Sequence, residues 1–184
     1  MTEQQARGTH VGESVGASFA RDAAPGRLPL LYLETSIFGF YYDEEPRNVL
    51  RREAVRELFH QVDIGLLNVV TSPATVEELA DTPGRYGSDL LGLLAEVGVL
   101  ELDEAEVMRL ASSYLNERII PADYSQDARH AAYATVGGVG IIVTLNLRHL
   151  ANEWAERRIN AVNLREGYPL IRIRTPEEVL RYGE

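Results

Sequence analysis

The sequence predicts an α/β protein in which helices cover both faces of a central, mostly parallel sheet, giving a three-layer α/β/α sandwich. Residues 141–144, IIVT, form a run that is apolar at consecutive positions and mostly β-branched. Such a run is typical of a strand that helices bury on both faces. A helical segment, residues 122–136, precedes this strand, and Gly137 and Gly138 separate the two. Helical and strand-like segments alternate in this way along most of the chain, which favours a parallel sheet.

The individual elements follow from hydrophobic period and from start and stop signals. In order, we expect a strand at residues 28–33, a helical turn at 37–42, a helix at 48–62, a strand at 66–71, a helix from 73 to about 81–84, a helix at 88–97, a weaker strand at 99–102, a helix after 103 that breaks at 119–121, a helix at 122–136, a strand at 141–144, mostly helix at 147–166, a strand at 168–173 and a terminal turn of helix. Ser72 followed by Pro73 is a typical helix start. Asp103 and Thr175 are the expected caps of two later helices.

Composition places limits on the class of protein. Residues 1–27 are rich in glycine, alanine and small polar residues and predict a disordered tail, so residues 28–184 are expected to form one domain. The chain has no cysteine, no secretion signal and no apolar run long enough to span a bilayer, which fits a cytoplasmic protein. The net charge of −10 argues against broad attraction to nucleic acid, although it leaves room for a local basic groove. All 18 basic residues are arginine.

Four polar side chains are expected to meet at one edge of the sheet. Glu34 ends the first strand, and Asn146 follows the strand at 141–144. Glu78 lies early in the helix that leaves the second strand. Asp127 lies early in the helix that leads into the strand at 141–144. Crossover helices run antiparallel to their strands, so all four residues belong to the carboxyl edge, where α/β proteins bind ligands.

These residue types in one place are typical of a site for a hard divalent cation. Carboxylates held together repel one another unless a cation neutralises them. Oxygen ligands without cysteine select Mg²⁺ or Mn²⁺ rather than zinc. Such an ion can activate water and stabilise charge on a phosphoryl group. The alternative is that these acids are solvated side chains and helix caps, because a chain with 28 acidic residues places some at any edge.

At these positions the sequence resembles the PIN-domain ribonucleases, which include the toxins of bacterial toxin–antitoxin pairs. LYLETSIFGF, residues 31–40, is similar to the family's first motif, an aspartate followed by Thr-Ser. SPATVEELADTP, residues 72–83, resembles the second motif. PADYSQDARHAAYA, residues 121–134, resembles the third, and VTLNLRHL, residues 143–150, the fourth. The motifs occur in the family's order between about residue 30 and residue 180.

The resemblance implies a compact PIN-like fold and a Mg²⁺- or Mn²⁺-dependent endoribonuclease that cleaves RNA by a metal-activated water. It further implies a type II toxin, with a cognate antitoxin and a homodimer as expected partners. Carried over by position, Glu34, Glu78, Asp127 and Asn146 would be both the catalytic and the metal-binding residues. Those that orient the acids or contact RNA would be Thr35, Ser36, Thr144, His130 and His149.

Two departures from the family pattern leave an alternative open. Glu34 stands where aspartate is usual, which moves the carboxylate by about 1.5 Å, one C–C bond. Asn146 stands where aspartate is common and lowers the charge of the pocket by one. The alternative is therefore a PIN-like module that binds RNA or protein without cutting. A small-molecule-binding doubly wound domain has no support, since the chain has neither a G-x-G-x-x-G turn nor a P-loop.

Other features each allow two interpretations. His130 and His149 could contact substrate, or they could be a packed histidine and a turn cap. The aromatic residues within 37–42 could form a groove for an antitoxin helix, a dimer contact or part of the core. Two groups of cationic side chains could steer RNA or simply be solvated: Arg51, Arg52 and Arg56, and Arg148, Arg157, Arg158 and Arg165.

Overall fold

Within the described residues, the sheet is built from five parallel strands. The computed structural model describes residues 28–82 and 86–181, so the tail expected at 1–27 lies outside the described residues. The strands are β1 (Leu30–Leu33), β2 (Asn68–Thr71), β3 (Gly98–Val99), β4 (Ile141–Val143) and β5 (Arg172–Arg174). They are arranged in the order β3-β2-β1-β4-β5, and every neighbouring pair is parallel.

Helices follow the strands along the chain. In order they are α1 (Thr35–Tyr41), the 3₁₀ turn η2 (Pro46–Asn48), α2 (Val49–Asp63), α3 (Pro73–Ala80), α4 (Tyr86–Leu94), α5 (Glu104–Asn116), the 3₁₀ turn η3 (Ala122–Tyr124), α6 (Ser125–Val136), α7 (Glu153–Glu166) and α8 (Pro176–Arg181). Within the described residues, none of these helices has the length and apolar character that crossing a membrane requires.

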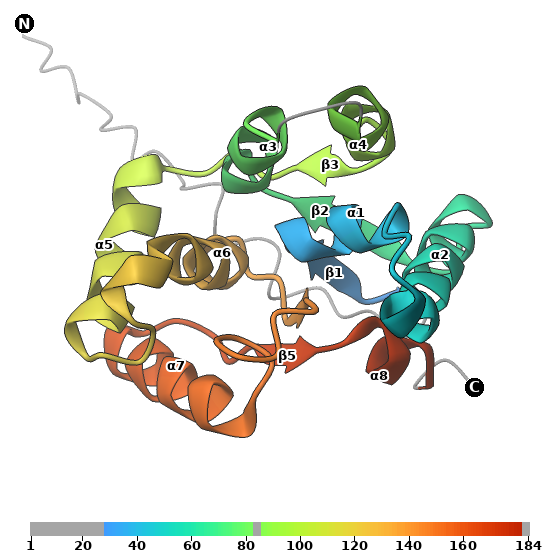
Figure 1. Cartoon of the computed structure of the whole chain (residues 1–184). Helices are drawn as coiled ribbons and strands as arrows, with labels where there is room; N and C mark the ends of the chain where they lie inside the picture. The colour runs from blue at the N-terminus through green and yellow to red at the C-terminus, as the bar shows by residue number, and fades with distance from the viewer. Residues whose placement is uncertain (1–27, 83–85, 182–184) are drawn as a thin grey trace, which may run out of the picture.

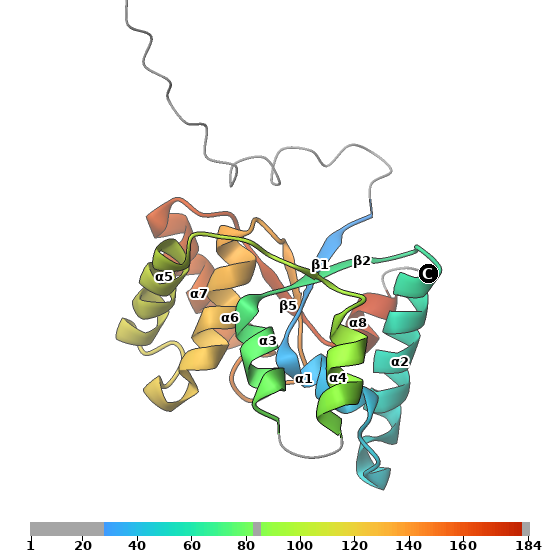
Figure 2. The same cartoon turned by 90° about the horizontal axis from the view of Figure 1, so that it is seen from above.

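The helices form two layers, one on each face of the sheet (Figures 1 and 2). Helices α5, α6 and α7 pack on one face, where Tyr32, Ile142 and Ile173 point into the core. Helices α1, α2, α4 and α8 cover the other face, where Leu31 and Val143 are buried. Side chains that alternate along β1 thus enter two different cores, as the pleat of a strand requires. The expected three-layer α/β/α sandwich is confirmed, and its sheet is wholly parallel.

The chain reverses its direction of travel across the sheet beside β1. From β1 it moves through β2 to β3 at one edge, and it then returns to β4 on the other side of β1. Strands β1 and β4 are paired in register, with Leu33 opposite Val143. The crevice outside the carboxyl ends of two such strands is where open parallel sheets bind their ligands. The residues that follow these two strands are Glu34 and Thr144 to Asn146.

The last strand is shorter than the sequence predicts, because helix α7 engages the backbone that precedes it. The side chain of Asn160 donates to the carbonyl of Ile171 (2.8 Å) and accepts from its N–H (2.9 Å). Asn163 donates to the carbonyl of Pro169 (3.3 Å). The backbone of Pro169 and Ile171 therefore pairs with side chains of α7 rather than with β4, and the ladder begins at Arg172. The same contacts occupy backbone groups at the edge of the sheet, which would otherwise be open to pairing with another chain.

The segment expected to be helical from residue 147 starts its helix later, at Glu153. Residues 147–152 form turns, in which the Asn146 carbonyl accepts from the N–H groups of Leu150 (3.2 Å) and Ala151 (2.9 Å). Asn152 then caps α7, since its side-chain oxygen accepts from the N–H of Ala155 (2.9 Å). This non-helical stretch leaves Asn146 and His149 on a turn beside the end of β4.

Candidate functional site

The structure brings the four predicted site residues to the carboxyl edge of the sheet, and this group is called the rim below. Glu34 directly follows β1, and Asn146 lies just beyond β4. Glu78 is on α3, which leaves β2, and Asp127 is in the first turn of α6. Glu34 and Asp127 are buried, with 5% and 8% of their surface exposed, whereas Glu78 and Asn146 are half-buried. Acidic groups are rarely buried in this way unless they are paired or bind an ion.

Two hydroxyl groups hold the carboxylate of Glu34. Its Oε2 accepts from Ser36 Oγ (2.5 Å) and from Thr144 Oγ1 (2.7 Å). The same hydroxyls accept backbone N–H groups of the following turn: Ser36 from Leu145 (3.0 Å) and Thr144 from Asn146 (2.9 Å). Neither hydroxyl can rotate away without losing a backbone partner, so the position of the Glu34 carboxylate is fixed by the ends of β1 and β4. Within the described residues, its other oxygen, Oε1, has no hydrogen bond.

Asn146 holds Asp127 and closes the turn after β4. Its side-chain amide donates to Asp127 Oδ2 (2.9 Å), and its side-chain oxygen accepts from the backbone N–H of His149 (3.2 Å). The ring of His149 stacks on Tyr124, with the centroids 3.7 Å apart. As for Glu34, one carboxylate oxygen of Asp127 is held, and the other has no hydrogen bond within the part of the chain that the structure describes.

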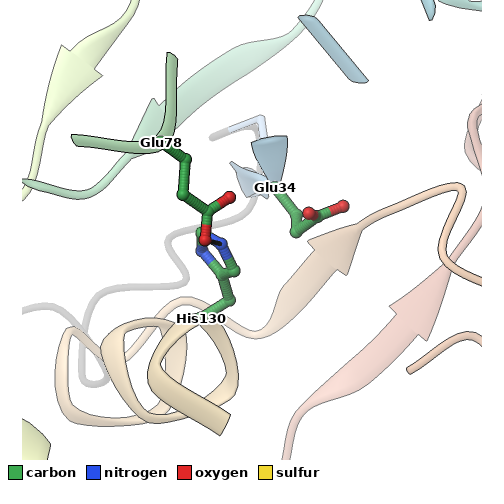
Figure 3. A group of neighbouring side chains, drawn as sticks. All are labelled: Glu34, Glu78 and His130. Atoms are coloured by element: carbon green, nitrogen blue, oxygen red, sulfur yellow. Dashed lines mark ion pairs between the residues drawn. The ribbon is translucent and has the colours of Figure 1, made fainter. Parts of the chain in front are cut away.

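His130 lies behind the acids and binds Glu78 (Figure 3). Its Nε2 is 3.3 Å from Glu78 Oε1 and 3.3 Å from Thr35 Oγ1. Its Nδ1 is 2.7 Å from the hydroxyl of Tyr32, which is itself 2.6 Å from Ser72 Oγ. The ring is fully buried, so both nitrogens are satisfied by protein groups and water does not reach them. His130 therefore orients Glu78 from the interior of the molecule.

The neighbouring carboxylates and His130 raise or lower one another's pKa values. Burial, followed by the charge of Glu34, raises the pKa of Asp127 to about 6, although the hydrogen bond from Asn146 works in the opposite direction. Burial lowers the pKa of His130, but the hydrogen bond with Glu78 and the surrounding carboxylates outweigh it and raise that pKa. Burial likewise opposes ionisation of Glu78, and the hydrogen bond and charge of His130 reverse the effect, so the pKa of Glu78 falls. Both shifts favour the charged form of the group concerned, as expected for an ion pair between His130 and Glu78.

The donor set fits a hard divalent cation. Glu34, Glu78 and His130 offer ligand atoms that all lie within 4.8 Å of one another, and Asp127 is close enough for Glu34 to affect its ionisation. Three carboxylates near one another form an oxygen-rich donor set, which Mg²⁺ and Mn²⁺ prefer. The unbonded oxygens of Glu34 and Asp127 are the free ligand atoms. Both nitrogens of His130 are already engaged, so the ring is a less suitable ligand than the carboxylates.

Sequence reasoning missed Tyr32 and Ser72, which complete the site. Tyr32 was expected only as an apolar residue of the first strand, and Ser72 as a helix cap. Ser72 does stand at the N-cap of α3, but its side chain makes no capping bond and contacts Tyr32 instead. A signal was present, because a tyrosine in the middle of a buried strand needs a partner for its hydroxyl.

A scan of the chain against models of known protein families finds no match, and a comparison with curated proteins finds none either. The chemistry of the site must therefore be inferred from its own residues.

Proposed function

We propose that this chain is a Mg²⁺- or Mn²⁺-dependent endoribonuclease of the PIN type, which hydrolyses phosphodiester bonds of RNA. The observation that carries the proposal is the group of Glu34, Glu78 and His130 outside the carboxyl ends of β1 and β4, with the buried Asp127 beside it and an unbonded oxygen on both Glu34 and Asp127. Acids held close together in a largely buried place cost stability, and a protein that retains them there is expected to use them.

The three carboxylates would hold the ion, and Asn146 would hold Asp127. A bound divalent ion would supply a Lewis acid that activates water and stabilises negative charge on the phosphate. The protein's own contribution is to fix the carboxylates in advance. Ser36 and Thr144 keep the Glu34 carboxylate in one orientation, and His130, anchored on Tyr32, does the same for Glu78.

The resemblance to PIN-domain toxins extends the proposal to the biological role. We propose a cytoplasmic type II toxin that acts as a homodimer and is held inactive by a cognate antitoxin. The aromatic segment divides between core and surface in a way that leaves room for such a partner. Phe38 is fully buried, whereas Phe40, Tyr41 and Tyr42 are half-buried and pack against the same core from its edge.

One observation favours the second candidate, a PIN-like module that binds RNA or protein without cutting. Ser36 and Thr144 donate to Glu34, Asn146 donates to Asp127, and His130 pairs with Glu78, so each of the three acids has a partner within the protein. A cluster whose acids the protein already holds needs a metal ion less. This candidate predicts weak or absent binding of Mn²⁺ by calorimetry, whereas the nuclease predicts one clear binding event that Asp127→Asn removes.

The deciding experiment is cleavage of a mixed RNA pool by the purified protein in Mn²⁺, in Mg²⁺ and in EDTA. The nuclease predicts cleavage that requires metal and is lost in Asp127→Asn. Asp123→Asn is the matched control, because Asp123 is an exposed acid of η3 close by in sequence, and this variant should cleave like the wild type. Cleavage by Asp127→Asn at the wild-type rate would show that a co-purifying nuclease is responsible and would refute the assignment.

A further inference from the structure

A hollow lies beside the acidic rim, which is formed by Glu34, Glu78, Asp127 and Asn146. It has a volume of about 320 Å³ and is lined by Arg118, Ile119, Pro121, Arg148, His149, Asn152 and Trp154. The rim and the hollow share one turn, because the N–H of His149 is bonded to the side chain of Asn146. On its other side, Pro121 opens the short η3 segment that leads into α6 and Asp127. A ligand bound at the acidic rim would therefore lie next to this hollow.

The hollow is positively charged in a strongly acidic protein. Among the described residues, eight arginines form an ion pair with a carboxylate: Arg47, Arg52, Arg56, Arg109, Arg129, Arg157, Arg165 and Arg174. Arg118 and Arg148 form none with any described residue, although the chain carries a net charge of −10. Both are exposed. Two cations without a carboxylate in one hollow favour an anionic ligand over a neutral one.

Aromatic side chains lie beside these arginines. Trp154 is 54% exposed, and the guanidinium of Arg158 lies 5.1 Å from its ring centroid. The His149 ring is held against Tyr124, which is itself 39% exposed. Large exposed aromatic rings next to cations are the features with which proteins bind single-stranded nucleic acid: the rings stack on bases and the cations neutralise phosphates. The volume lies at the small end of ligand pockets and suits one nucleotide.

We propose that this hollow is the subsite for the nucleotide next to the scissile phosphate of single-stranded RNA. Its base stacks on the ring surface of Trp154 and His149, and Arg118 and Arg148 neutralise the phosphates that flank it. The proposal rests on the proposed ribonuclease function for its choice of ligand. It deepens that function by giving the enzyme a preference for unpaired RNA, since a base within a duplex could not reach a ring.

The test uses the only tryptophan of the chain as the reporter, because Trp154 lies in the hollow. A six-nucleotide uridine oligomer is titrated into the full-length protein in EDTA, where no metal-dependent cleavage occurs. Tryptophan fluorescence and the anisotropy of a labelled oligomer are followed together. We expect binding to quench the fluorescence. The double variant Arg118→Gln/Arg148→Gln should bind at least tenfold more weakly.

Two controls separate this subsite from general charge and from damage to the rim. Arg51→Gln removes a cation of α2 that also has no carboxylate partner among the described residues, so it should bind RNA like the wild type. The melting-temperature rise that Mn²⁺ produces should be the same in the double variant as in the wild type. An equal loss of binding in Arg51→Gln, or unchanged binding in the double variant, would overturn the subsite.

Failure of the subsite and failure of the nuclease give different results. If cleavage requires metal but the affinity for the oligomer is the same in the double variant as in the wild type, the subsite is refuted and the proposed nuclease function is not. Binding that depends on both arginines and quenches Trp154, without cleavage in any metal, would support the subsite in a non-catalytic module. If both hold, the double variant should raise KM for the oligomer substrate and leave kcat within about twofold.

Discussion

Asp127 is the acid of the site whose pKa the fold raises. Its pKa is about 6 in the folded chain, against 3.8 for an unperturbed aspartate, because it is buried near Glu34. The folded state therefore binds this proton more tightly than the unfolded state does. The stabilisation from that proton is complete below about pH 4 and is lost as the pH rises through 6. At neutral pH without metal, the charge on Asp127 destabilises the protein.

The variant Asp127→Asn should consequently be more stable than the wild type at pH 7 in EDTA. Asparagine has no charge to bury, and its side-chain oxygen can still accept from Asn146. The shift of the pKa corresponds to a gain on the order of 3 kcal/mol. Thermal unfolding at pH 7 and pH 4 is the measurement, and the gain should shrink at pH 4.

In the presence of metal, the wild type should become more stable than Asp127→Asn. A ligand that binds only the folded state raises its stability in proportion to the logarithm of its concentration over Kd. Mn²⁺ should therefore raise the melting temperature of the wild type and of the control Asp123→Asn, but not that of Asp127→Asn. A lower melting temperature for Asp127→Asn than for the wild type in EDTA at pH 7 would contradict the assignment of a charge cost to this residue.

Thr144 connects the backbone after β4 to the carboxylate of Glu34, and its removal should affect both stability and metal binding. In Thr144→Val, Glu34 loses a donor and the N–H of Asn146 loses its acceptor. An unsatisfied buried group costs about 1–3 kcal/mol. Loss of a group that orients a metal ligand typically weakens metal binding by about 10–100-fold. Urea unfolding and Mn²⁺ calorimetry measure the two effects.

Thr71→Val is the matched control for Thr144→Val. Thr71 is also fully buried, and its hydroxyl donates to the carbonyl of Leu33 (2.8 Å) without contacting an acid. This variant should lose stability and keep its affinity for Mn²⁺. Equal affinities in both variants would show that Thr144 has no part in positioning Glu34.

At the scale of elements, capping signals predicted helix starts well where the side chain had no better partner. Asp103 accepts from Ala105 (3.0 Å), and Thr175 exchanges hydrogen bonds with Glu178 in a capping box at the start of α8. Ser72 occupies the same kind of position, yet its hydroxyl contacts Tyr32. Local sequence could not reveal this choice, because the competing partner lies 40 residues away.

Replacing either of two glycines with alanine should change the free energy of unfolding, and the two changes should have opposite signs. Gly167 ends α7 with φ of 82°, a left-handed conformation that costs a residue with a Cβ atom about 1–2 kcal/mol. Gly92 lies within α4, where a Cβ atom would meet nothing within 4 Å. There, alanine should stabilise the helix by roughly 0.5–1 kcal/mol. Urea unfolding of Gly167→Ala and Gly92→Ala measures both, and a stabilised Gly167→Ala would show that the end of α7 adjusts without strain.

At the scale of the whole molecule, the position of the acidic rim could be predicted and the cationic hollow could not. One topological rule placed Glu34, Glu78, Asp127 and Asn146 at the same edge, because parallel strands carry their carboxyl ends together. No comparable rule joins Arg118, after α5, to Arg148 and Trp154, which lie about 30 residues further along the chain. Their proximity depends on how α5, α6 and α7 pack, and the sequence pattern does not encode that packing.

The distribution of charge over the molecule leads to a prediction about salt. Arg118 and Arg148 are attractive to RNA within a protein whose overall charge repels it. Each phosphate contact made by a cation on single-stranded nucleic acid contributes about 0.7 to the slope of log affinity against log salt concentration. The double variant Arg118→Gln/Arg148→Gln should therefore show a slope shallower by about 1.4 than that of the wild type.

Anisotropy titrations of the uridine oligomer over a series of salt concentrations measure this slope. Arg51→Gln should keep the wild-type slope, since Arg51 does not line the hollow. Weaker binding by the double variant with an unchanged slope would mean that the two arginines support the shape of the hollow rather than contact phosphate. If the slope in Arg51→Gln were as shallow as in the double variant, RNA binding would depend on the total charge of the protein. The hollow would then have no special role.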